Sequence, residues 1–252
     1  MDLSLLRTPR WIAGTALALL AVLVFANLGL WQLRRHEERM AANATIAERL
    51  GLAPESLDNL VVETEADPAR LQWNRVTVDG NYFAGADIIL HGRSHKASAG
   101  SNLLTPLISD GGVVVIVNRG WIPLDATIAP GADAAPVTVT GILRPDEGSG
   151  LLSGGGGSRD SLKSIDLERI DASLGNAVLP VYLQLETQQP MAPGAPEVLP
   201  QPKLDQGPHR SYAVQWFLFA AIVAIGFPVL VYRTAKERVR TPERPSTSSS
   251  VP

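Results

Sequence analysis

Three side chains near residue 210 combine a possible iron ligand with flat aromatic rings. His209, Tyr212 and Trp216 are spaced i, i+3, i+7, which predicts that they share one face of a helix. An imidazole nitrogen ligates haem iron, and aromatic rings contact the macrocycle. The alternative is structural, because tyrosine and tryptophan are common at membrane interfaces without any ligand. The pattern makes His209 a candidate haem ligand and leaves the interfacial alternative open.

Cationic side chains are expected at the same level. Arg210 follows His209, Arg34 and Arg35 follow an earlier apolar segment, and Gln215 lies beside the aromatic residues. Guanidinium groups pair with carboxylates such as haem propionates. Arginines that only flank a membrane span are the alternative.

The other histidines have weaker patterns. His91 and His95 are four residues apart, a spacing that suits a metal only on a helix, and Gly92 between them predicts a loop. His36 stands among charged residues, where we expect it to be solvated. We therefore expect no zinc site and no metal contact apart from haem iron at His209.

Arg119 and Trp121 lie in the segment Asn118-Arg119-Gly120-Trp121-Ile122-Pro123, at the end of the most apolar predicted strand. Arginine and tryptophan are enriched at interaction hot spots, so the pair predicts a partner contact. A strand end with a turn and a buried tryptophan is the alternative.

Composition excludes several function classes. The chain of 252 residues has no cysteine, which excludes disulfides, cysteine-based zinc or iron–sulfur sites and c-type haem attachment. Copper delivery is not expected, because Cu(I) prefers sulfur ligands. A formal net charge of −3 gives no reason to expect nucleic-acid binding. Without GxSxG, HExxH or a glycine-rich phosphate loop, we expect no enzyme.

The elements that must position His209 are two apolar segments. Residues 11–33 and 211–232 contain 23 and 22 residues without a charge. Helices of this length cross a hydrocarbon core of about 30 Å. The first segment continues into charged residues rather than a cleavage site, so we interpret it as an anchor and not as a signal peptide.

Charge predicts the orientation of these spans. The tails 1–10 and 233–252 together carry seven basic and three acidic residues, whereas the loop 34–210 carries 15 basic and 22 acidic ones. The positive-inside rule then places both termini in the cytoplasm and the loop outside, in a multi-pass membrane protein.

The loop 34–210 is predicted to be mainly antiparallel β-structure, a small barrel or sandwich. Its first part, 34–50, is compatible with an extension of the first helix, and one short helix is expected over 166–174. Six strands are predicted, over 75–80, 88–90, 103–108, 113–117, 137–143 and 181–185.

Three stretches have a biased composition. Residues 148–158 contain six glycines and predict a flexible loop, and residues 190–208 contain six prolines and predict a semi-rigid spacer. The tail 233–252 is predicted to be disordered.

Four segments, in order, resemble the surfeit locus protein one family of cytochrome c oxidase assembly factors. They are Leu28-Gly29-Leu30-Trp31-Gln32-Leu33-Arg34, Arg75-Val76-Thr77-Val78-Asp79-Gly80, Val117-Asn118-Arg119-Gly120-Trp121-Ile122-Pro123, and His209-Arg210-Ser211-Tyr212-Ala213-Val214-Gln215-Trp216-Phe217. The resemblance covers residues 12–232. Gly207-Pro208 precede His209 here, where many members have an asparagine shortly before this histidine.

The resemblance implies a non-catalytic factor that binds a-type haem and assists its insertion into, or its stabilisation in, the large oxidase subunit. It implies His209 as the haem-linked histidine, with Trp216, Trp31 and Arg34 nearby. The large subunit, the enzyme of haem a synthesis and membrane lipid are the expected partners, and Gln32 and Gln215 are expected at a partner contact.

Two other functions remain open on the sequence. The protein can be a permanent accessory subunit of the oxidase without haem. Polysaccharide chain-length regulators also have two spans around an outer domain with a proline-rich stretch, but their outer domain is chiefly helical.

Overall fold

The computed structural model describes residues 7–125, 135–148, 161–162, 164–175, 177–191 and 194–240. Two compact units are present, Met1–Ala44 with Leu204–Pro252, and Thr45–Lys203. The helices are α1 (Pro9–Gly51), α2 (Leu57–Thr64), α3 (Pro68–Leu71), α4 (Leu167–Leu174) and α5 (His209–Arg240). The strands are β1 (Glu55–Ser56), β2 (Arg75–Tyr82), β3 (Ile88–His95), β4 (Ser98–Ser109), β5 (Val114–Pro123), β6 (Val137–Pro145), β7 (Ser161–Leu162) and β8 (Val178–Gln189).

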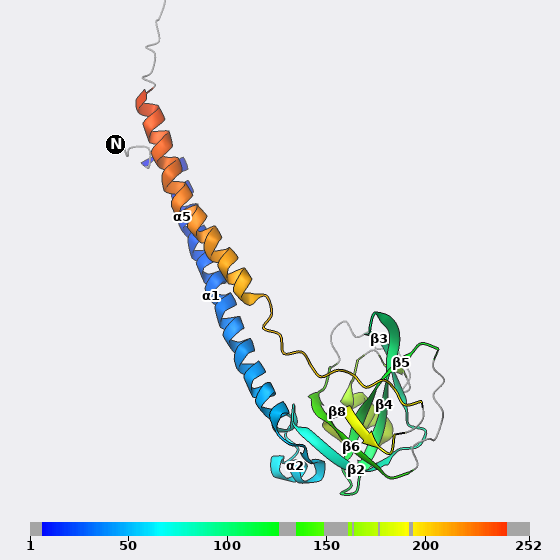
Figure 1. The fold of residues 1–252 in the computed structure, drawn as a ribbon. Helices are drawn as coiled ribbons and strands as arrows, with labels where there is room; N and C mark the ends of the chain where they lie inside the picture. Colours follow the sequence, from blue (N-terminus) through cyan, green and yellow to red (C-terminus); the bar gives the residue numbers. More distant parts are fainter. Residues whose placement is uncertain are drawn as a thin grey trace, which may run out of the picture. The chain divides into compact units, whose positions relative to one another are not determined.

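The first unit is a pair of long apolar helices, α1 and α5, which lie side by side (Figure 1). Both are long and apolar enough to cross a membrane, and only 6% of the apolar window of each is buried inside the structure. Trp11 faces Phe227 near one end, and Phe25 faces Trp216 further along, so the helices are antiparallel. The start of α1 and the end of α5 therefore lie at the same end of the pair.

Both helices extend beyond the predicted spans. The predicted helical extension over 34–50 is confirmed, because α1 continues without a break to Gly51. Helix α5 continues past residue 232 to Arg240, so the first part of the predicted tail is helical. Residues 241–252, and residues 149–158 of the predicted glycine-rich loop, lie outside the described residues.

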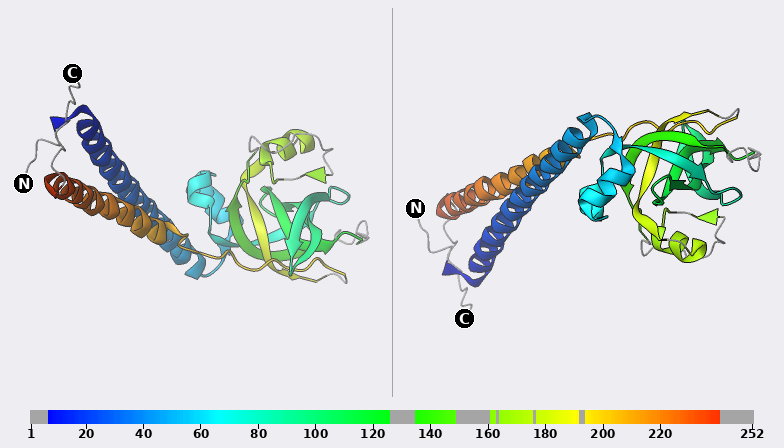
Figure 2. Two further views of the ribbon diagram at one scale, coloured as in Figure 1. Left: turned by 90° about the horizontal axis from the view of Figure 1, so that it is seen from above. Right: turned by 90° about the horizontal axis from the view of Figure 1, so that it is seen from below.

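The second unit contains a mixed sheet that closes into a small barrel (Figure 2). Among the described strands, the spatial order is β2, β6, β8, β5 and β4, each paired with the next. Strand β4 also pairs with β2, from Gly80 opposite Ser109 to Tyr82 opposite Leu107, and this pairing closes the ring. Of the two predicted architectures, barrel and sandwich, the pairing of β4 with β2 fits the barrel, and most pairings are antiparallel as expected. The exception within the ring is β5, which runs parallel to β8.

Strand β5 is buried on both faces, which explains its uninterrupted apolar sequence. Val115 and Val117 belong to the main core inside the barrel. Ile116 belongs to a second cluster on the outside, where α4 supplies Leu167 and Ile170 (Figure 2). A strand buried on both faces needs no polar–apolar alternation.

Strand β3 is longer than predicted, whereas one short helix lies where it was expected. The loop predicted around His91 and His95 is instead part of β3, because a bulge at Gly92, with a φ of +74°, lets the strand continue. The short helix is confirmed, with Asp166 capping α4 by accepting a hydrogen bond from the Arg169 backbone N–H. Helices α2 and α3 were not predicted.

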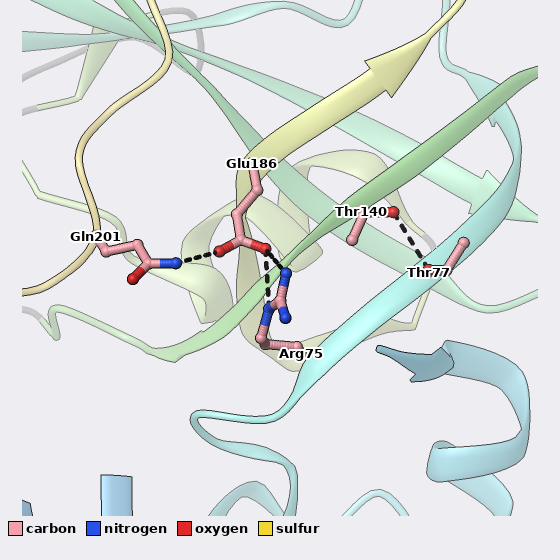
Figure 3. Close-up of polar contacts among 5 residues, drawn as sticks. All are labelled: Arg75, Thr77, Thr140, Glu186 and Gln201. Carbon is pink, nitrogen blue, oxygen red and sulfur yellow. Dashed lines mark hydrogen bonds and ion pairs between the residues drawn. The ribbon is translucent and has the colours of Figure 1, made fainter. Parts of the chain in front are cut away.

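A three-residue polar contact ties β2, β8 and the following segment together (Figure 3). Glu186 has no partner on β6, because β8 bulges there, and its side chain reaches across β6 to β2. Arg75 donates from Nε and from a terminal nitrogen to Glu186 Oε2 at 3.1 and 3.0 Å. Gln201 donates to Oε1 of the same carboxylate at 2.8 Å, so both oxygens are used.

The segment predicted as a spacer over 190–208 is attached along much of its length. Glu197 exchanges two backbone hydrogen bonds of 2.8 Å with Trp121 of β5. Gln184 of β8 donates to the Pro200 carbonyl at 3.0 Å. We call residues 194–201 the strap, because these contacts hold them against the barrel.

The Glu197 carboxylate anchors the strap through two side chains, Lys96 and His95. It accepts hydrogen bonds from Lys96 and from His95 Nε2, the latter at 3.1 Å. The Lys96 hydrogen bond, followed by that of His95, lowers the pKa of Glu197 below its ordinary value. The contribution of this carboxylate to the attachment is therefore complete above the pKa of a free glutamate and is lost as pH falls through the lowered pKa.

Replacing Arg75 tests the cross-barrel ion pair. We expect Arg75→Leu to destabilise the protein by about 1–3 kcal/mol, because it leaves a mostly buried carboxylate without its cation. Arg75→Leu/Glu186→Leu should lose less, since neither charge remains. Chemical unfolding of the full chain followed by circular dichroism measures both. Equal losses in the single and the double variant would contradict this assignment.

Replacing Lys96 tests the anchoring of the strap. In Lys96→Met we expect the pKa of Glu197 to rise toward the ordinary value, because the partner that lowers it most is lost. A carboxyl NMR titration of selectively labelled full-length protein measures this pKa. Lys203→Met, at an exposed lysine, is the control and should leave the titration unchanged. An unchanged pKa in Lys96→Met would refute the assignment.

Candidate functional site

A hydrogen bond between His209 and Gln32 joins the two long helices. His209 begins α5, and its Nδ1 lies 2.9 Å from Oε1 of Gln32 on α1. Both side chains are partly buried. Gln32 was expected at a partner contact, but the structure pairs it with the candidate ligand of the same chain.

This contact determines where the histidine proton lies. An amide oxygen has no hydrogen to donate, so the His209 Nδ1 must carry the proton and donate it to Gln32. In a neutral imidazole the other nitrogen, Nε2, then has a free lone pair. A neutral imidazole with one hydrogen-bonded N–H is the form in which histidine binds metals.

The backbone that leads into His209 is fixed on α1. The Asp205 carbonyl accepts hydrogen bonds from Asn43 at 2.8 Å and from Arg39 at 3.3 Å. Gly207 then adopts a φ of +66°, and a Cβ at this position would lie 3.2 Å from the His209 ring. The positive φ and the close ring together favour glycine at this turn.

A polar pocket of about 380 Å³ lies beside His209. Its lining includes Arg35, Arg39, Glu38 and Asp205. Arg35 pairs with Glu38 at 2.7 Å, and Arg39 lies 3.9 Å from Asp205. All four side chains are more than half exposed, so these ion pairs are weak and their cations can exchange to another anion.

Aromatic side chains pack between α1 and α5 further along the two helices. Trp216 stacks on Phe25 with ring centroids 5.7 Å apart and meets Phe219 edge-on at 5.9 Å. Gly29 is the buried residue of α1, and the Phe217 ring occupies the space that a side chain there would need. The small Gly29 therefore allows the close approach of the helices.

Other predicted residues lie away from this contact. Tyr212 is 47% exposed, whereas Ala213 is buried, so the packed face of α5 follows the spacing i, i+4, i+7 rather than i, i+3, i+7. Trp31 and Arg34 line a surface groove whose residues all belong to α1. Arg210 and Gln215 are exposed on α5. The structure thus brings His209 and Gln32 together and places Trp216 against Phe25, seven residues further along α5. It brings none of Tyr212, Trp31, Arg34, Arg210 and Gln215 to the His209–Gln32 contact.

The predicted partner contact at Arg119 and Trp121 is not an exposed surface. Arg119 is 5% exposed, and its guanidinium lies over the Tyr82 ring, 4.7 Å from the centroid. Trp121 is partly covered, lies 5.9 Å from the His95 ring and is bridged to the strap. The alternative of a structural strand end fits these residues better.

The remaining histidines are not assembled into a metal site. His91 Nδ1 lies 3.2 Å from the Ser101 hydroxyl, and His95 binds Glu197. His36 is half-buried rather than solvated, and its Nδ1 has no hydrogen-bond partner in the described part of the chain. No group of three or more His, Cys, Asp or Glu side chains among the described residues is placed to hold a metal ion.

Phe25 and the contacts of Arg39 and Asn43 with Asp205 were not predicted from the sequence. Phe25 was hidden inside an apolar segment, and the pairing of Arg39 and Asn43 with Asp205 joins residues more than 160 positions apart. A usable signal existed on α1, since Gln32, Arg39 and Asn43 are spaced i, i+7, i+11 and therefore share one face.

Glycine substitutions test the packing of α1 and α5. We expect Gly29→Ala to destabilise the helix pair by about 1–3 kcal/mol, because the methyl group would overlap the Phe217 ring. Gly14→Ala is the matched control, since its methyl group would meet Phe227 at 3.5 Å, an ordinary contact, and should be neutral or stabilising. Denaturant titration in detergent micelles measures both. The same sign of change in both variants would contradict this packing.

Comparisons with known proteins agree with the motifs. A family model described as the SURF1 family matches residues 19–221. An uncharacterised SURF1-like protein of Mycobacterium bovis is 31% identical over 262 residues, which cover 97% of this chain and 94% of the relative. A SURF1-like protein of Monosiga brevicollis is 26% identical, covering 83% and 84%, and one of Rickettsia bellii is 25% identical, covering 88% and 90%. The resemblance seen in the sequence is thus confirmed, and the chain belongs to the SURF1 family.

Proposed function

We propose that this protein is a non-catalytic assembly factor for haem–copper cytochrome c oxidase that holds a-type haem as cargo for the large oxidase subunit. Family membership supports the role in assembly. The observation that carries the haem part is the 2.9 Å contact between His209 Nδ1 and Gln32 Oε1, because it leaves Nε2 able to ligate iron.

The surroundings of His209 suit the chemistry of haem. Nε2 of His209 would ligate the iron, and Arg35 and Arg39 in the adjacent pocket would pair with propionates in place of their weak partners Glu38 and Asp205. Trp216 lies in the aromatic cluster with Phe25, seven residues further along α5, and would contact the macrocycle. We propose no role for copper or zinc.

We propose a bacterial plasma membrane as the location. Both apolar helices would span it, with the termini in the cytoplasm and the barrel outside. The antiparallel packing of α1 and α5 supports this topology, because it puts the start of one and the end of the other at the same end of the pair. Partners would be the large oxidase subunit, the enzyme of haem a synthesis and membrane lipid.

Removing the imidazole tests haem binding directly. Full-length protein purified from cells that make a-type haem should show its absorption bands, and His209→Ala should lose them because no iron ligand remains. His91→Ala, on the barrel, is the control and should keep the spectrum.

Two outcomes would contradict the haem proposal. The first is wild-type protein without a haem band, and the second is an unchanged band in His209→Ala. Constant stoichiometry with mature oxidase, in protein without haem, would instead indicate the accessory-subunit function.

A further inference from the structure

We infer that Gln32 is a positioning residue that holds His209 as the Nδ1–H tautomer and so reserves Nε2 for a ligand. No metal or substrate contact is assigned to Gln32 itself. It acts through the imidazole, from a different helix and from 177 positions away in the chain. The inference about the tautomer stands on the geometry of the protein alone.

The direction of the hydrogen bond carries the argument. The atom that faces His209 Nδ1 is the Gln32 oxygen, which can only accept. The contact is partly buried, so water competes poorly as an alternative partner for Nδ1. In a neutral ring the position of the single proton follows the hydrogen bond that the ring makes, and Gln32 therefore selects the tautomer.

The geometry around the pair limits the freedom of the ring. Asn43 and Arg39 fix the Asp205 carbonyl on the same face of α1, and Asp205 Oδ1 accepts from the Gly207 backbone at 3.0 Å. Gly207 then lies against the ring edge that carries Cδ2 and Nε2. A ring flip would put Cδ2 in place of Nδ1 beside Gln32 and so lose the hydrogen bond.

The consequence for iron rests on the proposed function. An outer-shell partner that fixes the tautomer of a ligating histidine changes metal affinity by about 10–100-fold when it is removed. We therefore expect Gln32→Leu to weaken haem binding by about this factor. Gln32→Glu should retain affinity, because a carboxylate of the same length also accepts the Nδ1 proton.

Histidine NMR of haem-free protein tests the tautomer without any ligand. Full-length protein with ¹⁵N-labelled histidine, in lipid nanodiscs, should show His209 with a protonated Nδ1 and an unprotonated Nε2, assigned by loss of the signal in His209→Gln. Gln32→Leu should lose this pattern, and Gln32→Glu should restore it. Leu33→Ala, at an exposed neighbour on α1, is the control.

Haem titration of the same variants separates the two proposals. An Nε2–H tautomer in the wild type, or the Nδ1–H tautomer unchanged in Gln32→Leu, would overturn the inference even if haem binds. The expected tautomers in protein that binds no haem would support the positioning of His209 by Gln32 and contradict the haem function alone. Equal haem affinity in the wild type and Gln32→Leu would overturn the consequence for iron.

Discussion

The hydrogen bond between Gln32 and His209 is the interaction on which the rest of the site depends. It joins the two apolar helices near the point where the chain enters α5. The contact is partly buried, so water competes poorly with it. Around it, Gly29 admits Phe217, Trp216 stacks on Phe25, and Asp205 is held by Arg39 and Asn43. Each contact restrains α5 against α1, and together they fix one imidazole.

The β-barrel is organised by a different constraint, the closure of its sheet. Pairing of β4 with β2 removes the free edges that the five strands of the described ring would otherwise have. The bulge at Glu186 then directs a carboxylate toward Arg75 and Gln201, and Glu197 anchors the strap at Lys96 and His95. As a result, the proline-rich segment is attached to the barrel over 194–201 and, after the boundary at Lys203, to α1 at Asp205. Its prolines and glycines predicted a spacer, but hydrogen bonds to distant residues decide its structure.

The sequence predicted those elements whose signal is local. Alternation over 75–80 and 137–143, and the charge-free segments 11–33 and 211–232, all lie in the expected elements. The strand through His91 and His95 was missed because Gly92 suggests a loop, whereas the bulge depends on pairing with β4. At the site, His209 and Gln32 were each singled out, but their contact with one another was not predicted, since it spans 177 positions. Tyr212 was assigned to the packed face because i+3 and i+4 neighbours are both close on a helix; only the packing against α1 distinguishes it from Ala213.

We propose that His209 of this SURF1 family member holds a-type haem on its way to the oxidase. The most direct measurement is the a-type haem content of oxidase in membranes from cells that lack this protein, normalised to the amount of the large subunit. We expect the large subunit to be present but depleted of a-type haem, and we expect the wild-type chain to restore the haem while His209→Ala does not. A normal ratio of a-type haem to large subunit in the absence of the protein would contradict it.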